Sequence, residues 1–217
     1  MAVRRCGQIL ACLSLFMVMS SQSNLQAQNA ELSTFSAAAV QDITSVVPNF
    51  GIVSPVFLRG GQPKEGGLAS LKRAGVKTIV NLRDGASDIQ AERKIAKTLG
   101  LNFVSIPLSV FKYASRDQVD QFLKVVNKPE NQPIFVHCRQ GQDRCGTMVA
   151  MYRMKEQAWT AKNAYEEMLK YGFHPFFVGL KWSVFSNDPA LVNGQPVLNK
   201  QAAPGKQQLP IVSNPAS

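Results

Sequence analysis

Two spacings of hydrophobic positions alternate along this chain, and each change of spacing marks a new element. Short runs rich in Val, Ile and Phe are typical of buried strands, and they occur at residues 56–58, 76–82, 103–106 and 134–136. Apolar residues three and four positions apart predict helices over residues 67–74, 87–99, 115–126, 147–157, 161–170 and 174–186. Capping boxes at Ser87/Gln90 and Ser115/Gln118 favour helix starts at these serines.

Strands that alternate with helices predict an α/β fold. We expect a central, mainly parallel sheet of four to five strands flanked by helices. Residues 28–50 are rich in Ala, Ser, Gln and Asn and predict a loosely ordered lead-in to a domain over residues 51–186. Residues 187–217 are rich in Pro, Gly, Gln and Asn, which favours a disordered tail.

The segment PIFVHCRQGQDRCGT, residues 133–147, concentrates the candidate chemistry. A strand ends at His137, a loop with a glycine follows, and Arg144 opens a helical segment. Backbone N–H groups at such a helix start attract an anion, and the same field stabilises a thiolate on Cys138. Arg144 adds a planar fork of donors that matches phosphate oxygens. The segment therefore predicts a nucleophile and an anion site in one loop.

His-Cys followed by five residues and Arg, at residues 137–144, resembles the signature loop of the cysteine-dependent protein tyrosine phosphatase superfamily. With LRGGQP at 58–63 and VKTIVNLRD at 76–84, residues 55–185 resemble the small bacterial dual-specificity-type phosphatases. The resemblance implies a dual-specificity phosphatase-like fold, and a phosphocysteine on Cys138 formed without metal or cofactor. It also implies a phosphate-binding loop made of Arg139, Gln140, Gly141, Gln142, Asp143 and Arg144.

Three residues are predicted to support this loop. Gly141 is expected at positive φ, where the loop turns its amides inward, and Gly146 is expected to allow close packing of the helix start. His137 precedes the nucleophile on a strand, so its side chain points to the opposite face. In the family this histidine holds the loop through hydrogen bonds, and we expect that role here.

The general acid is not fixed by the sequence. Related phosphatases place an aspartate upstream of the cysteine, but the matching stretch IPLSVFKY, residues 106–113, has no carboxylate. Asp117 follows, in the first turn of a predicted helix, where an acidic residue is common for helix-dipole reasons alone. Asp143 resembles the loop aspartate of myotubularin-type phosphatases; it is either the acid or a group that orients Arg144 or a loop amide.

Cys145 stands where the family usually has Ser or Thr, whose hydroxyl assists the leaving thiolate. A thiol is a weaker donor. We expect slower hydrolysis of the phosphoenzyme, or a reversible disulfide between Cys138 and Cys145 that protects the nucleophile.

Several residues outside the loop carry alternative interpretations. Arg59 and Arg83 end predicted strands, where they contact either substrate or nearby carboxylates. Lys112 and Arg139 are expected at the rim of the site, and His174 is interpreted as a helix-start residue.

Residues 1–27 predict a secretory signal peptide, with Arg4 and Arg5 before an apolar core and a small-residue exit. We expect a periplasmic or secreted protein without stable membrane insertion after cleavage; an uncleaved N-terminal anchor is the alternative. The net charge of +10 is dispersed, so a nucleic-acid partner is not expected. A monomer is expected.

These observations predict a hydrolase of phosphomonoesters, acting on a phosphorylated protein or a small molecule such as an inositol phosphate. Two alternatives stay open: a catalytically silent module that binds phosphorylated ligands, and a sulfurtransferase of the rhodanese type.

Overall fold

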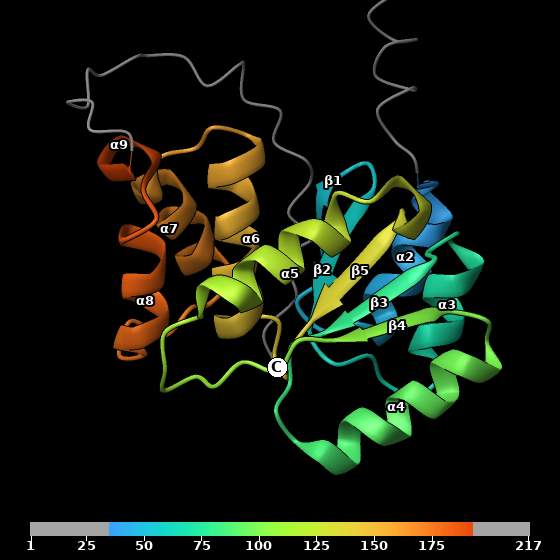
Figure 1. Cartoon of the computed structure of the whole chain (residues 1–217). Helices are drawn as coiled ribbons and strands as arrows, with labels where there is room; N and C mark the ends of the chain where they lie inside the picture. Colours follow the sequence, from blue (N-terminus) through green and yellow to red (C-terminus); the bar gives the residue numbers. More distant parts are fainter. Residues whose placement is uncertain (1–34, 193–217) are drawn as a thin grey trace, which may run out of the picture. The chain divides into compact units, whose positions relative to one another are not determined.

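The structure is a computed structural model that describes residues 35–192, so the expected signal peptide lies outside the described residues. Figure 1 shows a central sheet with helices on both faces. The strands are β1 (Gly51–Ser54), β2 (Phe57–Gly60), β3 (Thr78–Asn81), β4 (Asn102–Ser105) and β5 (Ile134–His137). The helices are α2 (Ala37–Val46), α3 (Gly67–Arg73), α4 (Ala86–Thr98), α5 (Arg116–Val126), the 3-10 helix η1 (Pro129–Asn131), α6 (Asp143–Glu156), α7 (Ala161–Lys170), α8 (Val178–Phe185) and α9 (Pro189–Val192).

The sheet has the order β1-β2-β5-β3-β4, and β5 therefore lies at its centre. The β1–β2 pair is antiparallel, whereas β2, β5, β3 and β4 run parallel. This arrangement confirms the predicted fold class. The four-residue strand β1 was not expected, because GIVS is too short to show a spacing of its own.

Alternate residues of the central strand face two different cores. Ile134 and Val136 are fully buried in the cluster that includes the inner faces of α5, α6, α7 and α8. Phe135 and His137, on the opposite face, are equally buried. A strand that is covered on both faces shows no alternation of apolar and polar residues, which is why residues 134–136 of β5 are all apolar.

The carboxyl ends of three parallel strands are in register, since His137 pairs with Gly60 on one side and with Asn81 on the other. The loops that follow β2, β3 and β5 therefore meet at one edge of the sheet. Ligands bind at this edge in open α/β sheets, because the crevice forms where neighbouring connections leave on opposite faces.

The lead-in was predicted incorrectly over residues 37–46, which form helix α2. Ile43 and Val47 are buried four positions apart, and this short apolar stripe is hidden among small and polar residues.

The capping box predicted at Ser87 was also wrong. Helix α4 starts at Ala86 after an N-cap at Gly85 that has no side-chain cap, since alanine is a strong helix former. The box at Ser115 is confirmed.

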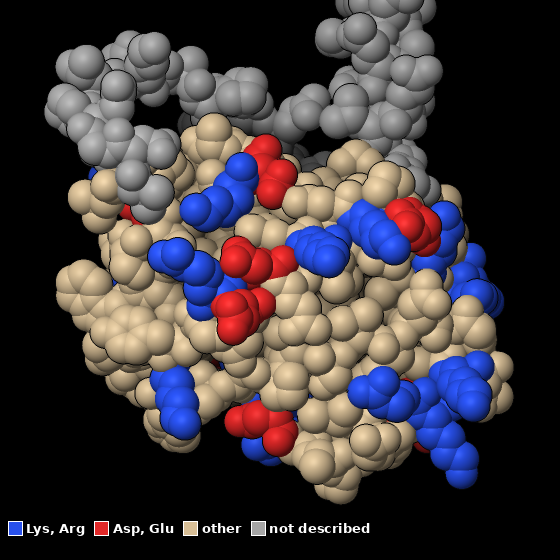
Figure 2. Space-filling model, in the orientation of Figure 1, with Lys and Arg blue, Asp and Glu red and all other residues tan. Residues whose placement is uncertain are grey.

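In the expected tail, Pro189–Val192 form the short helix α9, and residues 193–217 lie outside the described residues. Within residues 35–192, no helix is long and apolar enough to cross a bilayer. Figure 2 shows Lys and Arg side chains spread over the visible face, some of them side by side, with Asp and Glu among them.

Candidate active site

The loop between β5 and α6 is held from outside through its carbonyl groups. The carbonyls of Arg139, Gln140 and Gly141 all accept hydrogen bonds from residues that precede or follow β2 or lie within it. The donors, in the same order, are Gln62 N–H at 3.0 Å, Asn49 Nδ2 at 3.4 Å and Arg59 Nη2 at 2.8 Å.

A trans peptide directs its C=O and the following N–H to opposite sides. The N–H groups of Gln140, Gly141 and Gln142 are therefore turned to the inside of the loop. Within residues 35–192 these three N–H groups donate to no protein acceptor. Three unpaired amides around one point form a cradle for an anion.

Gly141 is required by this geometry. Its φ is +74°, and a Cβ at this position would lie 2.6 Å from the backbone of Gly60 and Gly61. The predicted positive φ is confirmed. The predicted close packing at Gly146 is confirmed as well, because a Cβ there would be 3.3 Å from the Met168 side chain.

Arg59 is buried beneath the loop with 1% of its surface exposed. Its guanidinium lies 3.7 Å from the centre of the Tyr171 ring and donates to the Gly141 carbonyl. No described carboxylate forms an ion pair with it, and its Nε and Nη1 have no partner among the described residues. The sequence offered substrate contact or ion pairing for Arg59; the structure instead makes it a support whose positive charge lies directly under the anion cradle.

Arg144, at the start of α6, is anchored through one nitrogen. Its Nη1 lies 2.7 Å from Asp84 Oδ1 and 3.4 Å from the Leu108 carbonyl. Its Nε is buried and has no partner among the described residues. The anchor leaves Nε and Nη2 available for two oxygens of one phosphoryl group. The sequence did not reveal that Asp84 positions Arg144, since the two lie sixty residues apart.

His137 supports the loop from the other face of the sheet, as predicted. Its Nδ1 lies 3.2 Å from the Cys138 carbonyl, and its Nε2 lies 3.1 Å from Glu92 Oε1. Burial raises the pKa of the Glu92 carboxyl, but hydrogen bonds from His137, Asn81 and Gln62 outweigh it, so the pKa is lowered overall. The sequence did not predict this role of Glu92, which lies on α4, because its partner His137 lies on β5.

Cys138 and Cys145 are both free thiols and both buried. Cys145 Sγ donates to the Val136 carbonyl at 3.6 Å. Burial raises the pKa of the Cys145 thiol to about 12, although the nearby Arg59 charge lowers it in part. A thiol in this state is a poor nucleophile, so the predicted disulfide with Cys138 needs a structural change to form quickly.

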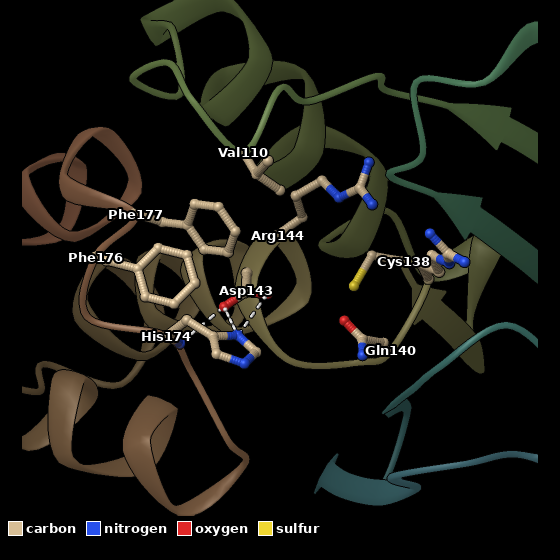
Figure 3. A pocket seen from close by; sticks show the side chains of 9 residues that line it. Val110, Cys138, Gln140, Asp143, Arg144, His174, Phe176 and Phe177 are labelled. Carbon is tan, nitrogen blue, oxygen red and sulfur yellow. Dashed lines mark hydrogen bonds and ion pairs between the residues drawn. The ribbon is translucent and has the colours of Figure 1, made fainter.

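The two candidate acids lie in different places. Asp143 is buried in the first turn of α6, and its carboxylate contacts His174. Asp117 is exposed in the first turn of α5 and does not line the cavity at Cys138. The cavity has a volume of about 330 Å³. Figure 3 shows the Cys138 sulfur directed into it. Its lining residues are Val110, Cys138, Arg139, Gln140, Asp143, Arg144, His174, Phe176 and Phe177.

The predictions for the other basic residues near the site have different outcomes. Arg139 lines the cavity, whereas Lys112 is exposed and does not line it. Arg83 pairs with Asp88 and donates to Gln62 Oε1 at 3.0 Å, which confirms the carboxylate alternative for Arg83.

Comparison with known proteins agrees with this geometry. Residues 40–176, more than half of the chain, match the family described as DSP-PTPase phosphatase fused to NAD⁺ kinase. The chain belongs to this family. The resemblance to cysteine-dependent dual-specificity phosphatases is thereby confirmed.

Two relatives and one crystal structure illustrate the similarity. The dual specificity protein phosphatase TpbA of Pseudomonas aeruginosa is 28% identical over 122 residues, which are 56% of this chain and 53% of TpbA. Inositol diphosphatase DSP3 of Arabidopsis thaliana is 26% identical over 147 residues, 65% of this chain and 68% of DSP3. The crystal structure of P. aeruginosa TpbA has a TM-score of 0.57 at 25% identity, over 69% of this chain and 88% of that chain. The chain thus spans about half the length of TpbA. It also matches chloroplastic NAD kinases of rice and A. thaliana, but over only a tenth of the length of those proteins.

Proposed function

We propose that this protein hydrolyses phosphomonoesters through a phosphocysteine on Cys138. The observation that carries the proposal is the set of N–H groups on Gln140, Gly141 and Gln142 that have no acceptor among the described residues, in the loop that joins Cys138 to Arg144. Cys138, Gln140 and Arg144 of this loop line one cavity, into which the Cys138 sulfur points (Figure 3). Such donors bind three phosphoryl oxygens and stabilise the charge that develops on them in the transition state.

In the first step the Cys138 thiolate attacks phosphorus and the ester oxygen leaves. In the second step water attacks phosphorus, and the thiolate leaves as inorganic phosphate forms. Arg144 binds the phosphoryl oxygens in both steps through Nε and Nη2 while Asp84 holds Nη1. The relatives named above are phosphatases, which supports this proposal over a silent binding module or a sulfurtransferase.

The cavity wall favours an aryl phosphate, such as a phosphotyrosine side chain, over an inositol phosphate. Val110, Phe176 and Phe177 line one side of the cavity (Figure 3), and Phe176 is 69% exposed at its mouth. An aromatic leaving group packs on these side chains. A polyphosphorylated ring would need several cations at the mouth. Among the described residues, the only Lys or Arg side chains that line the cavity are Arg139 and Arg144, and a protonated His174 would add one more positive charge.

The test compares phosphate release from a phosphotyrosine peptide and from inositol phosphates, under reducing conditions. Wild type should prefer the peptide, and Cys138→Ser should abolish release from both. Arg144→Lys keeps the charge but loses the planar fork, so kcat/KM should fall by about 10²- to 10³-fold. Tight binding of phosphate esters without release by wild type would instead support the silent module, and sulfur transfer from thiosulfate would support the sulfurtransferase.

Export is proposed from the sequence of residues 1–27 alone. Cell fractionation and the mass of the mature protein's N-terminus would test it. A cytoplasmic protein that retains Met1 would contradict it.

A further inference from the structure

The carboxylate of Asp143 is fully engaged by one neighbouring residue. Its Oδ1 accepts from the His174 backbone N–H at 2.9 Å and lies 3.0 Å from His174 Nδ1. Its Oδ2 lies 3.2 Å from the same ring nitrogen. An oxygen that already accepts from a backbone N–H is placed to accept again from Nδ1. This arrangement fits an ionised Asp143 and a His174 ring that carries hydrogen on Nδ1.

The second ring nitrogen of His174 is left without such a partner. No hydrogen bond from Nε2 is formed to any described residue, and 40% of the side chain is exposed. The ring contacts Phe176 and Phe177, with centroids 5.3 Å and 5.9 Å away. The Asp143 carboxylate fixes the Nδ1 edge of the ring, and the two phenyl rings flank it. His174 lines the cavity that also contains Cys138 (Figure 3), so Nε2 is the ring nitrogen that no described residue engages.

We propose that His174 is the proton donor to the leaving group, and that Asp143 is the positioning residue that holds it. The inference rests on the proposed phosphatase activity. When the Cys138 thiolate bonds to phosphorus, the P–O bond breaks and its electron pair stays on the ester oxygen. That oxygen takes the proton from His174 Nε2, which leaves a neutral ring.

The second step restores the enzyme. The neutral Nε2 accepts a proton from the attacking water, the P–S bond breaks, and its electron pair returns to Cys138 as the thiolate. Asp143 stays ionised throughout, and it stabilises the doubly protonated ring by its charge.

Other candidate donors are placed less well. Asp117 is exposed on α5 outside the cavity, and Asp84 is paired with Arg144. Glu92 lies on the opposite face of the sheet with His137. The charged groups that line the cavity with His174 are Asp143, Arg139 and Arg144.

The test uses leaving groups that differ in their need for a proton. The leaving oxygen of phosphotyrosine needs a proton, whereas p-nitrophenyl phosphate releases p-nitrophenolate, which is stable as an anion. The readout is the ratio of kcat/KM for phosphotyrosine to kcat/KM for p-nitrophenyl phosphate. This ratio reports the first chemical step and cancels a loss of folded protein. His174→Asn retains an amide N–H near the Nδ1 position but supplies no acid.

We expect His174→Asn to lower this ratio by about 10²-fold or more, because general acid catalysis typically contributes 10²- to 10⁴-fold. Asp143→Asn should lower it by a smaller factor, since the ring loses its charged partner but keeps its position. Asp117→Asn is the matched control, a carboxylate removed outside the cavity, and should leave the ratio unchanged. Thermal unfolding of each variant confirms that it is folded.

A ratio in His174→Asn within about twofold of wild type would overturn the inference. A full loss in Asp143→Asn alone would make Asp143 the acid and would also overturn it. Failure of the proposed function looks different: wild type would release phosphate from neither substrate, or Cys138→Ser would remain active.

Discussion

Replacement of Gly141 by alanine would place a methyl group against the backbone of the loop after β2. The residue has φ +74°, and the new Cβ would lie 2.6 Å from Gly60 C and Gly61 N. Neither atom belongs to a flexible side chain, so the two loops must move apart. Movement there disturbs the Arg59 bond to the Gly141 carbonyl and the adjacent unpaired amides.

Gly66→Ala provides a matched control. Gly66 has nearly the same φ, +75°, but a Cβ there meets nothing within 4 Å. Gly66→Ala should therefore lose only the free energy of unfolding that is needed to hold alanine at a left-handed φ, about 1–2 kcal/mol, without any steric overlap. Gly141→Ala carries the same cost plus about 1–3 kcal/mol for forced displacement of packed atoms.

For a domain of this size about 1 kcal/mol changes Tm by roughly 2–4 °C. We expect Tm to fall by a few degrees in Gly66→Ala and by about twice as much in Gly141→Ala. The kcat/KM for phosphotyrosine should fall by about 10²-fold in Gly141→Ala, as for loss of one oxyanion donor, and stay near wild type in the control. Calorimetry and steady-state kinetics measure both. Equal Tm and equal kcat/KM in the two variants would refute the cradle geometry described above.

Three further predictions concern the groups around the loop. Asp84→Ala should lower kcat/KM by about two- to fivefold, because a half-exposed carboxylate orients Arg144 only weakly; an increase would show that Asp84 opposes phosphate binding. The pKa of Glu92 is lower in the folded state than its unfolded value of 4.5. The ionised carboxylate therefore stabilises the folded protein fully above pH 4.5, and this stabilisation is lost as the pH falls through the lower folded pKa. Glu92→Gln should therefore reduce Tm at pH 7 and flatten its decline in acid, and an unchanged pH profile would contradict this. With a pKa of about 12, only a fraction of about 10⁻⁴ of Cys145 is thiolate at pH 8. Iodoacetamide should therefore label Cys138 first and Cys145 only after unfolding, as measured by peptide mass spectrometry. Equal labelling of both cysteines in the folded protein would contradict the burial argument.

The local sequence predicted Cys138 as a nucleophile in a loop between a strand and a helix, and the structure confirms the strand and the helix. Residues 134–136 are all apolar because β5 is covered on both faces, and a single loop that runs into α6 spans the five residues between Cys138 and Arg144. Positive φ at Gly141 and the cap at Ser115 also follow from local residue chemistry, and both are confirmed. Helix α2 was missed because Ile43 is the only one of its residues that is fully buried, and Val47 follows just after its end.

The partners of those residues were decided by tertiary structure. Asp84 meets Arg144, Glu92 meets His137, and His174 meets Asp143 across thirty to sixty residues of intervening chain. No local spacing encodes such contacts, because they arise only when parallel strands align their carboxyl ends and the connecting loops converge. The sequence by itself predicted Cys138 as the nucleophile and residues 139–144 as the phosphate-binding loop. Only the folded chain decided which carboxylate holds Arg144, which cation lies under the loop, and that His174 stands beside Asp143 at the mouth of the cavity.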